Sequence, residues 1–257
     1  MFSIDLNCDL GESFGSYSAG NDAEIMKYIT SANIACGFHA GDAMVMKKTV
    51  QLAKEASVKI GAHPGFPDLQ GFGRRQMGLS SEEIYSITLY QLGALEGFLR
   101  SHSLKLNHIK PHGALYNMAA DHAPSANAIA KAVNDFDRSL IFYGLSGSEL
   151  TRAAEAYGLS VGYEVFADRT YMPDGKLTPR THEKALISNL DQAVAQSLQI
   201  ITEQKVTSVD GTIIPMKGTT ICLHSDGPGA LELAKRLNEE LKSAGITVKS
   251  LEKEASL

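Results

Sequence analysis

Carboxylates, imidazoles and cations follow the ends of short apolar segments along this chain, in most cases beside a glycine. The residues in these positions are Asp9, Glu12, His39, Asp42, His63, Lys110, His112, Glu164, Asp168, Arg169, His224 and Asp226. Carboxylates and imidazoles transfer protons near neutral pH, and cations bind anionic groups. Adjacent glycines let the backbone approach a ligand closely. This combination indicates acid–base chemistry on a small anionic substrate.

Each of these residues also has an ordinary structural explanation when it is taken singly. Asp9 and Asp42 stand near expected helix starts and could cap them, while Glu12 could satisfy a turn. Arg74 and Arg75 could be a solvated pair. Because unpaired ionisable groups are costly to bury, their gathering at six segment ends favours a functional site. The histidines that lie off this pattern, and that we interpret as structural, are His102, His108, His122 and His182.

The apolar segments have strand character, and helical patterns separate them. We expect strands at Ser3–Asn7, Ser31–Cys36, Lys59–His63, His108–Lys110, Leu140–Tyr143, Val161–Val165 and Thr220–His224. Amphipathic spacing predicts helices at Ala43–Ala56, Ser80–His102, Ser146–Tyr157, Glu183–Glu203 and Gly229–Ala244. Strands that alternate with helices are typical of β/α units and a parallel sheet.

The whole chain of 257 residues is interpreted as one domain, because no linker or low-complexity tract divides it. Seven or eight parallel strands in this length favour a single TIM-like (β/α) barrel over an open sheet. Active sites of such barrels lie at the carboxyl ends of the strands, where the polar clusters fall. The pattern of residues Lys205–Lys217 predicts a small hairpin with Asp210-Gly211 as its turn.

Composition excludes several classes of protein. Hydrophobic residues make up 44% and charged residues 21%, so the chain can bury a core. The net charge of −5 gives no electrostatic signature of binding to nucleic acid or to an anionic membrane. The apolar runs are short and broken by charges, so we expect no membrane span. The segment Met1–Asp5 has no leader pattern, so we expect a cytoplasmic location. We expect Cys8, Cys36 and Cys222 to be buried free thiols.

Familiar catalytic motifs are missing from the sequence. It contains no G-x-x-x-x-G-K-[ST] phosphate loop, no G-x-G-x-x-G fingerprint and no H-E-x-x-H pair. The glycine spacing around Ser146 does not fit a nucleophile elbow, and an apolar strand end does not favour a Cys36 thiolate. Asp9, His63 and His112 could converge on a metal ion, although no tight ligand spacing supports one.

Six stretches resemble the motifs of the LamB/YcsF family, in order along nearly the whole chain. They are 5–12 (DLNCDLGE), 31–42 (SANIACGFHAGD), 61–68 (GAHPGFPD), 71–75 (GFGRR), 110–117 (KPHGALYN) and 164–169 (EVFADR). Near its end the family usually shows His-Gly-Asp, where this chain has His224-Ser225-Asp226. The resemblance implies a barrel related to glycoside hydrolases and deacetylases. It also implies opening of 5-oxoproline to L-glutamate, coupled to hydrolysis of ATP with magnesium, together with two partner subunits, B and C.

That reaction suggests a role for each group of residues. Lys110 and Arg169 are the first choices to bind phosphate or carboxylate, followed by Arg74 and Arg75. Asp9, His63 or His112 would be the base for water. The side chains of Asn7 and Asn33 would stabilise developing negative charge. The residues that would orient these groups are His39, Asp42, Glu164, Asp168, His224 and Asp226, and Glu12 would join the residues that bind substrate or phosphate.

Two other kinds of function stay open. A metal-dependent amidase or sugar deacetylase could use a similar barrel, and it would need neither ATP nor partners. A non-catalytic subunit could instead bind substrate for its partners, in which case substitutions at the strand ends would weaken binding or assembly without abolishing chemistry.

Overall fold

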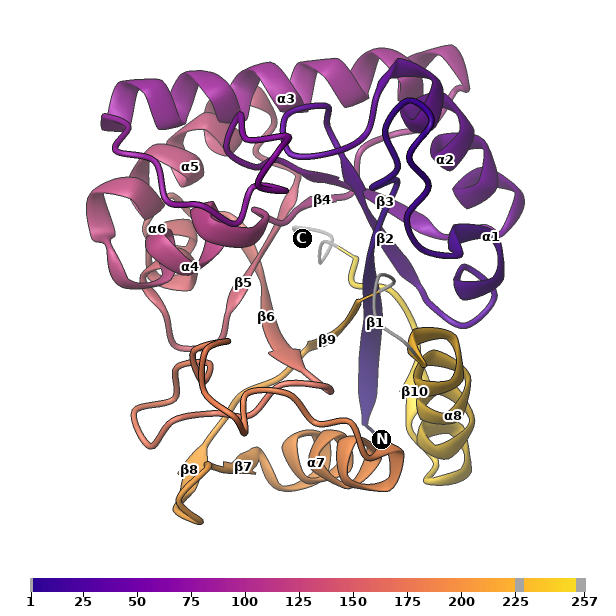
Figure 1. Ribbon diagram of the computed structural model, residues 1–257, viewed down its shortest axis with the longest axis vertical. Coiled ribbons are helices and arrows are strands. Elements are labelled where there is room, and N and C mark those ends of the chain that lie inside the picture. The colour runs from indigo at the N-terminus through magenta and orange to yellow at the C-terminus, as the bar shows by residue number, and fades with distance from the viewer. Residues whose placement is uncertain (1, 225–228, 253–257) are drawn as a thin grey trace.

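Seven parallel strands close into a barrel in the computed structural model, which describes residues 2–224 and 229–252 (Figure 1). In barrel order the strands are β1 (Ser3–Leu10), β2 (Ser31–Ala35), β3 (Lys59–His63), β4 (His108–Ile109), β5 (Ile141–Leu145), β6 (Ser160–Phe166) and β9 (Thr220–His224). Pairing of β9 with β1, in the register Asp5 to Thr220, closes the ring. The predicted single-domain TIM-like barrel is therefore confirmed, with seven strands in the closed sheet.

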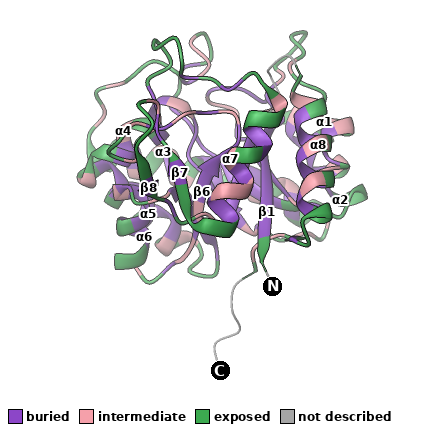
Figure 2. Ribbon diagram, turned by 90° about the horizontal axis from the view of Figure 1, so that it is seen from below, coloured by how far each residue is buried: buried purple, intermediate pink, exposed green. Residues whose placement is uncertain are grey.

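Helices surround the barrel with their buried sides facing the strands, as the burial colours of Figure 2 show. They are α1 (Asp22–Ile25), α2 (Ala43–Glu55), α3 (Ser81–Ser101), α4 (Gly113–Asp121), α5 (Ala123–Phe136), α6 (Glu149–Ala156), α7 (Leu190–Glu203) and α8 (Ala230–Ser243). The predicted hairpin is confirmed as the antiparallel pair β7 (Lys205–Thr207) and β8 (Ile213–Pro215). A short strand, β10 (Thr247–Val248), pairs with the start of β1.

Local capping explains why several helices begin where they do. Ser80 and Glu83 form a reciprocal capping box at the start of α3. The Asp42 carboxylate accepts hydrogen bonds from the backbone N–H groups of Met44 and Val45 at the start of α2. Its structural explanation as a helix cap is thus confirmed. The alternative that Asp9 caps a helix is wrong, because β1 continues to Leu10.

Two stretches differ from the expected helices. The helix expected from Glu183 begins only at Leu190, after the Asn189 side chain caps it. The chain before it is an irregular loop, 167–189, which is fixed by the isolated bridges Arg169–Leu186 and Tyr171–Leu177. Helices α4 and α5 were not among the expected helices. Both nevertheless bury one face, where their alanines pack closely.

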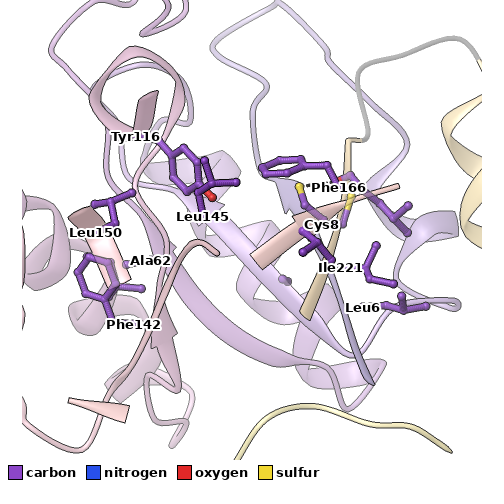
Figure 3. Packing of buried hydrophobic residues seen from close by; sticks show 14 of the residues in the cluster. Leu6, Cys8, Ala62, Tyr116, Phe142, Leu145, Leu150, Phe166 and Ile221 are labelled. Atoms are coloured by element: carbon purple, nitrogen blue, oxygen red, sulfur yellow. Dashed lines mark hydrogen bonds between the residues drawn. The ribbon is translucent and has the colours of Figure 1, made fainter. Parts of the chain in front are cut away.

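The inside of the barrel is polar, and the apolar core lies between the strands and the helices. Side chains alternate along a strand, so Asp5, Asn7 and Asp9 of β1 face inward while Leu6 and Cys8 face the helices. Figure 3 shows part of the outer packing, with Leu6 and Cys8 near Ile221 and with Phe142 near Leu150. Burying each large apolar side chain contributes about 1.5–3 kcal/mol.

The three cysteines are buried and form no disulfide bond, as expected. Burial raises the pKa of Cys36 to about 12, which agrees with the expectation that it forms no thiolate. Within residues 2–224 and 229–252, no helix has the length and apolar character needed to cross a membrane.

Asp5 anchors the amino-terminal end of the barrel. Its Oδ1 accepts hydrogen bonds from Thr30 Oγ1 at 2.6 Å and Ser31 Oγ at 2.7 Å. Its Oδ2 accepts from Thr220 Oγ1 at 2.6 Å and Tyr143 OH at 3.0 Å. Burial raises the pKa of Asp5, and these donors only partly oppose that rise. One carboxyl group thereby joins β1, β5 and β9 to the start of β2.

We expect Asp5→Ala to lower the free energy of unfolding by about 3 kcal/mol or more, because each buried polar group left unsatisfied costs about 1–3 kcal/mol. Asp5→Asn should cost less, since its amide oxygen can still accept two hydroxyl hydrogen bonds. Urea unfolding of the two variants measures the difference. Equal losses would contradict this account of Asp5.

Candidate active site

A cavity of about 450 Å³ opens at the carboxyl ends of the strands. This volume lies within the range of about 300–1,000 Å³ that is usual for small-molecule sites. Predicted site residues that line it are Asp9, Glu12, His63, Arg74, Lys110, His112, Arg169 and His224. Asn7, Asn33 and Glu164 lie buried in the barrel, where they contact this set. The structure therefore brings most of the predicted residues together.

The Lys110 ammonium lies at the bottom of the cavity among acidic and polar groups. Its Nζ is 2.8 Å from Asp9 Oδ1 and 2.9 Å from Glu164 Oε1. It also lies 2.9 Å from Cys222 Sγ and 3.3 Å from Asn7 Oδ1. An ammonium has three N–H donors, and these neighbours use all of them. The described geometry therefore fits Lys110 as the residue that positions Asp9 better than as a direct ligand of phosphate.

Charge pairing keeps Lys110 and Asp9 ionised. Burial lowers the pKa of Lys110, but the neighbouring Asp9, Cys222 and Glu164 outweigh it and raise that pKa well above its usual range. Burial likewise raises the pKa of Asp9, but its neighbours His63 and Lys110 bring it well below its usual range. An ionised carboxylate thus faces the cavity at neutral pH.

A layer of amides supports the cluster from below. Asn33 Nδ2 donates to Asp9 Oδ1 at 2.8 Å and to Asn7 Oδ1 at 2.7 Å. His108 Nε2 donates to Asn33 Oδ1 at 2.8 Å. Burial lowers the pKa of His108 to about 3, so its ring is neutral. A side chain at Gly61 would collide with this ring, which explains the glycine. The structural interpretation of His108 agrees with these contacts, and the amides of Asn7 and Asn33 are held in fixed orientations.

Three imidazoles and one carboxylate form a second cluster beside the first. His63 Nε2 lies 2.9 Å from His112 Nδ1 and 3.4 Å from Asp9 Oδ2. Glu12 Oε1 lies 3.5 Å from His112 Nδ1 and 3.3 Å from His39 Nε2. The His39 ring stacks on that of His112, with centroids 3.7 Å apart. Burial lowers the pKa of both His39 and His112 well below the usual range, so both rings are neutral. These four residues offer donor atoms within 4.8 Å of one another and form one group of candidate metal ligands. Asp9, Cys222 and His224 form a second group among the described residues.

His224 and Asp168 form an ion pair at the rim. Asp168 Oδ2 accepts a hydrogen bond from His224 Nδ1 at 2.8 Å, and the His224 ring stacks on Phe166. Burial lowers the pKa of His224, but the nearby Asp168 carboxylate raises it above its usual value. Burial raises the pKa of Asp168, but His224 brings it below its usual value. The pair is therefore charged at mildly acidic pH.

Cations lie around the mouth of the cavity, and two of them were not predicted. Arg74 and Arg169 are lining residues, as expected, and they are joined by Lys176 and Arg180. Arg169 donates to the backbone oxygens of Thr178 and Ala185, so it also shapes the loop. No strand-end signal could have pointed to Lys176 and Arg180, because both belong to loop 167–189. Tyr116 and Phe166 also line the cavity; the sequence showed them only as parts of longer motifs.

Asp42 and Arg75 belong neither to the cavity lining nor to the clusters that contact it. Asp42 caps α2 and also accepts a hydrogen bond from the backbone N–H of Gly15. Arg75 pairs with Asp68 outside the cavity, which holds the pKa of Asp68 at about 2. Asp226 lies outside the described residues.

The ion pair at the rim gives a pH prediction. We expect Asp168→Asn to lower the pKa of His224 below its ordinary 6.5, because burial would then act without the carboxylate that opposes it. NMR titration of the His224 ring Cε1–H measures this change. An unchanged His224 pKa in the variant would disprove the pairing.

The same pair should stabilise the fold only within a window of pH. A raised histidine pKa contributes stability below 6.5, and this is lost as the pH rises through the folded value. A lowered aspartate pKa contributes stability above 3.8, and this is lost as the pH falls. Urea unfolding should therefore show the largest loss in Asp168→Asn between these two values.

Comparisons with known proteins agree with this architecture. The sequence model of the LamB/YcsF family matches residues 4–256. A protein of Bacillus subtilis (strain 168), named as the A subunit of 5-oxoprolinase, is 55% identical over 256 residues, with 100% of both chains covered. A protein of the same name from Geobacillus thermodenitrificans (strain NG80-2) is 55% identical over 254 residues, or 99% of each chain.

Solved structures show the same fold. The crystal structure of a lactam utilization protein from Thermus thermophilus has a TM-score of 0.93 and 43% identity, and the match covers 97% of this chain and 100% of that one. A T48 deacetylase with substrate has a TM-score of 0.50 and 14% identity, with 96% and 87% covered, and shares the fold alone. The barrel, the motifs at its strand ends and these full-length matches lead to one conclusion: the chain belongs to the LamB/YcsF family.

Proposed function

We propose that this chain is the A subunit of an ATP-dependent 5-oxoprolinase that opens 5-oxo-L-proline to L-glutamate together with subunits B and C. The single observation that carries the proposal is the ionised Asp9 carboxylate, held by Lys110 at the bottom of a cavity whose mouth carries arginines. A base beside a site for anions suits a substrate that has both a carboxylate and a lactam. The names of the full-length relatives support the same reaction.

ATP would activate the lactam, which is a poor electrophile. The lactam oxygen attacks the γ-phosphorus of ATP, the bond from that phosphorus to ADP breaks, and an O-phosphorylated cyclic imidate forms. The sequence contains no phosphate loop, so we assign the binding of ATP and magnesium to the complex rather than to this chain alone. The cations at the cavity mouth would hold the carboxylate and phosphoryl groups of this intermediate.

Ring opening would then take place at Asp9. Water adds to the activated ring carbon while Asp9 accepts a proton from it. The carbon–nitrogen bond breaks as the nitrogen takes up a proton, which gives a glutamyl phosphate. A second water releases phosphate and leaves L-glutamate. Lys110 and Asn33 keep Asp9 ionised and oriented throughout.

Glutamate release from 5-oxoproline tests the proposal directly. The chain is assayed alone and with subunits B and C, in each case with and without ATP. The proposal requires release only when partners and ATP are both present. Release by the chain alone without ATP would instead identify a self-sufficient amidase. Absence of release from a folded, assembled complex would overturn the substrate assignment.

We expect Asp9→Asn to lower glutamate release by the complex about 10²–10⁴-fold, the usual contribution of a general base. The substituted side chain still offers an oxygen to Lys110 and Asn33, so the fold should persist. Asp191→Asn is the matched control, because Asp191 is an exposed residue of α7. Full activity of a folded Asp9→Asn complex would remove Asp9 as the base.

Substitutions of the adjacent residues Arg74 and Arg75 should differ in their effect on substrate binding. Arg74 lines the cavity, whereas Arg75 pairs with Asp68 outside it. Loss of one charge-assisted contact costs about 1.5–3 kcal/mol, so Arg74→Met should raise the KM for 5-oxoproline about tenfold or more. Arg75→Met should leave the KM unchanged. Steady-state kinetics of both complexes decide the matter, and equal effects would contradict the assigned positions.

A further inference from the structure

His63 Nε2 and His112 Nδ1 face each other, and the hydrogen bonds made by the other nitrogen of each ring leave neither of them a hydrogen when the rings are neutral. His63 Nδ1 lies 2.7 Å from the Lys110 carbonyl oxygen, and His112 Nε2 lies 2.8 Å from the Phe72 carbonyl oxygen. A carbonyl only accepts, so each of these two nitrogens carries a hydrogen. In neutral rings, His63 Nε2 and His112 Nδ1 are then both lone pairs, 2.9 Å apart. Two lone pairs at this distance repel unless a positive species lies between or beside them.

We propose that Glu12, His63 and His112 form a binding site for a divalent cation of the zinc type, with a further coordination position open to the cavity. All three residues line the cavity and are buried. Their donor atoms would be Glu12 Oε1, His63 Nε2 and His112 Nδ1, which lie within 4.8 Å of one another. When bound, the ion would supply Lewis acidity toward an oxygen of the substrate.

The hydrogen bonds behind the two imidazoles have the arrangement that metal ligands need. A ligating histidine usually donates its other N–H to a carbonyl or carboxylate, which fixes its tautomer and orientation. His63 and His112 both do so, through carbonyls on two different segments. Bonds of about 2.0–2.2 Å place neighbouring ligand atoms about 3–3.5 Å apart. The spacings of 2.9 Å between the imidazoles and 3.5 Å from Glu12 to His112 are close to this range.

His39 is better placed to position Glu12 than to bind the ion. Its Nδ1 is buried without a hydrogen-bond partner, so it lacks the acceptor that supports the other two rings. Its Nε2 lies 3.3 Å from Glu12 Oε1 and can donate to it. Asp9 is not a member of the four-residue donor set. Its Oδ1 accepts from Lys110 and Asn33, and its Oδ2 lies 3.4 Å from His63 Nε2, behind the imidazole pair. These hydrogen bonds leave the imidazoles of His63 and His112 and the carboxylate of Glu12 as the ligands.

The test uses the untagged full-length chain after metal removal, titrated with Zn²⁺ or Co²⁺. We expect one ion per chain by elemental analysis and a Co²⁺ visible spectrum typical of nitrogen and oxygen ligands. Binding should shift the ring nitrogens His63 Nε2 and His112 Nδ1 in ¹⁵N spectra. His63→Gln and His112→Gln should each weaken binding at least 100-fold. His39→Gln should keep one ion with an affinity lowered about 10–100-fold, as is usual for a residue behind a ligand.

His102→Gln is the matched control. His102 directly follows α3 and does not line the cavity, so this variant should bind the ion like the unmodified chain. The unmodified chain itself provides the decisive result, so the proposal does not depend on the folding of any variant. A proton shared by His63 and His112 that persists when Zn²⁺ is added would overturn it. Equal binding by the chain and the His112→Gln variant would do the same.

The inference goes beyond the proposed reaction and does not rest on it. The readouts need no ATP, 5-oxoproline or partner subunit. Failure to bind an ion would therefore leave the proposed reaction standing, and failure to release glutamate would leave the ion site standing.

Discussion

The buried ammonium of Lys110 constrains everything around it. A lysine in a protein interior is costly unless opposite charges and hydrogen bonds replace its water. Here Asp9 and Glu164 supply the charge, from β1 and β6, the two strands that flank β9. Removing one partner of such a group typically costs about 3–5 kcal/mol, because the other charge is left buried. The cluster therefore fixes β1, β4 and β6 relative to one another at the end of the barrel where the cavity opens.

This cluster needs the polar interior that lies beneath it. In many barrels of this class, branched apolar residues fill the inside. Here the inward positions of β1 are Asp5, Asn7 and Asp9, one above the other, and each has partners on neighbouring strands. The partners change from layer to layer along β1. Hydroxyl groups donate to Asp5, the Asn33 amide donates to Asn7, and the Lys110 ammonium and the Asn33 amide donate to Asp9. The hydrophobic contribution to stability comes instead from the outer faces of the strands, where they pack on the helices.

The sequence predicts the barrel and the place of the site because both depend on local signals. Apolar segments that end in polar residues are visible without a structure, and parallel strands bring their ends together. Residue roles depend on three-dimensional partners and are less accessible. Arg74 and Arg75 are equivalent in the sequence, yet one lines the cavity and the other pairs with Asp68. Arg180 could not be predicted, because an irregular loop rather than a strand end brings it to the cavity. Similarly, only the positions of four neighbours reveal that the donors of Lys110 are already in use.

His63 connects the two halves of the site. Its Nδ1 is held by the backbone oxygen of Lys110, while its Nε2 faces both His112 and Asp9. The strand that positions the ammonium therefore also sets the tautomer of this imidazole. Any displacement of β4 would move the charge that keeps Asp9 ionised and, at the same time, the nitrogen that faces His112. The ion cluster and the imidazole pair consequently cannot vary independently, and a substitution at Lys110 should disturb both even though its side chain touches only one.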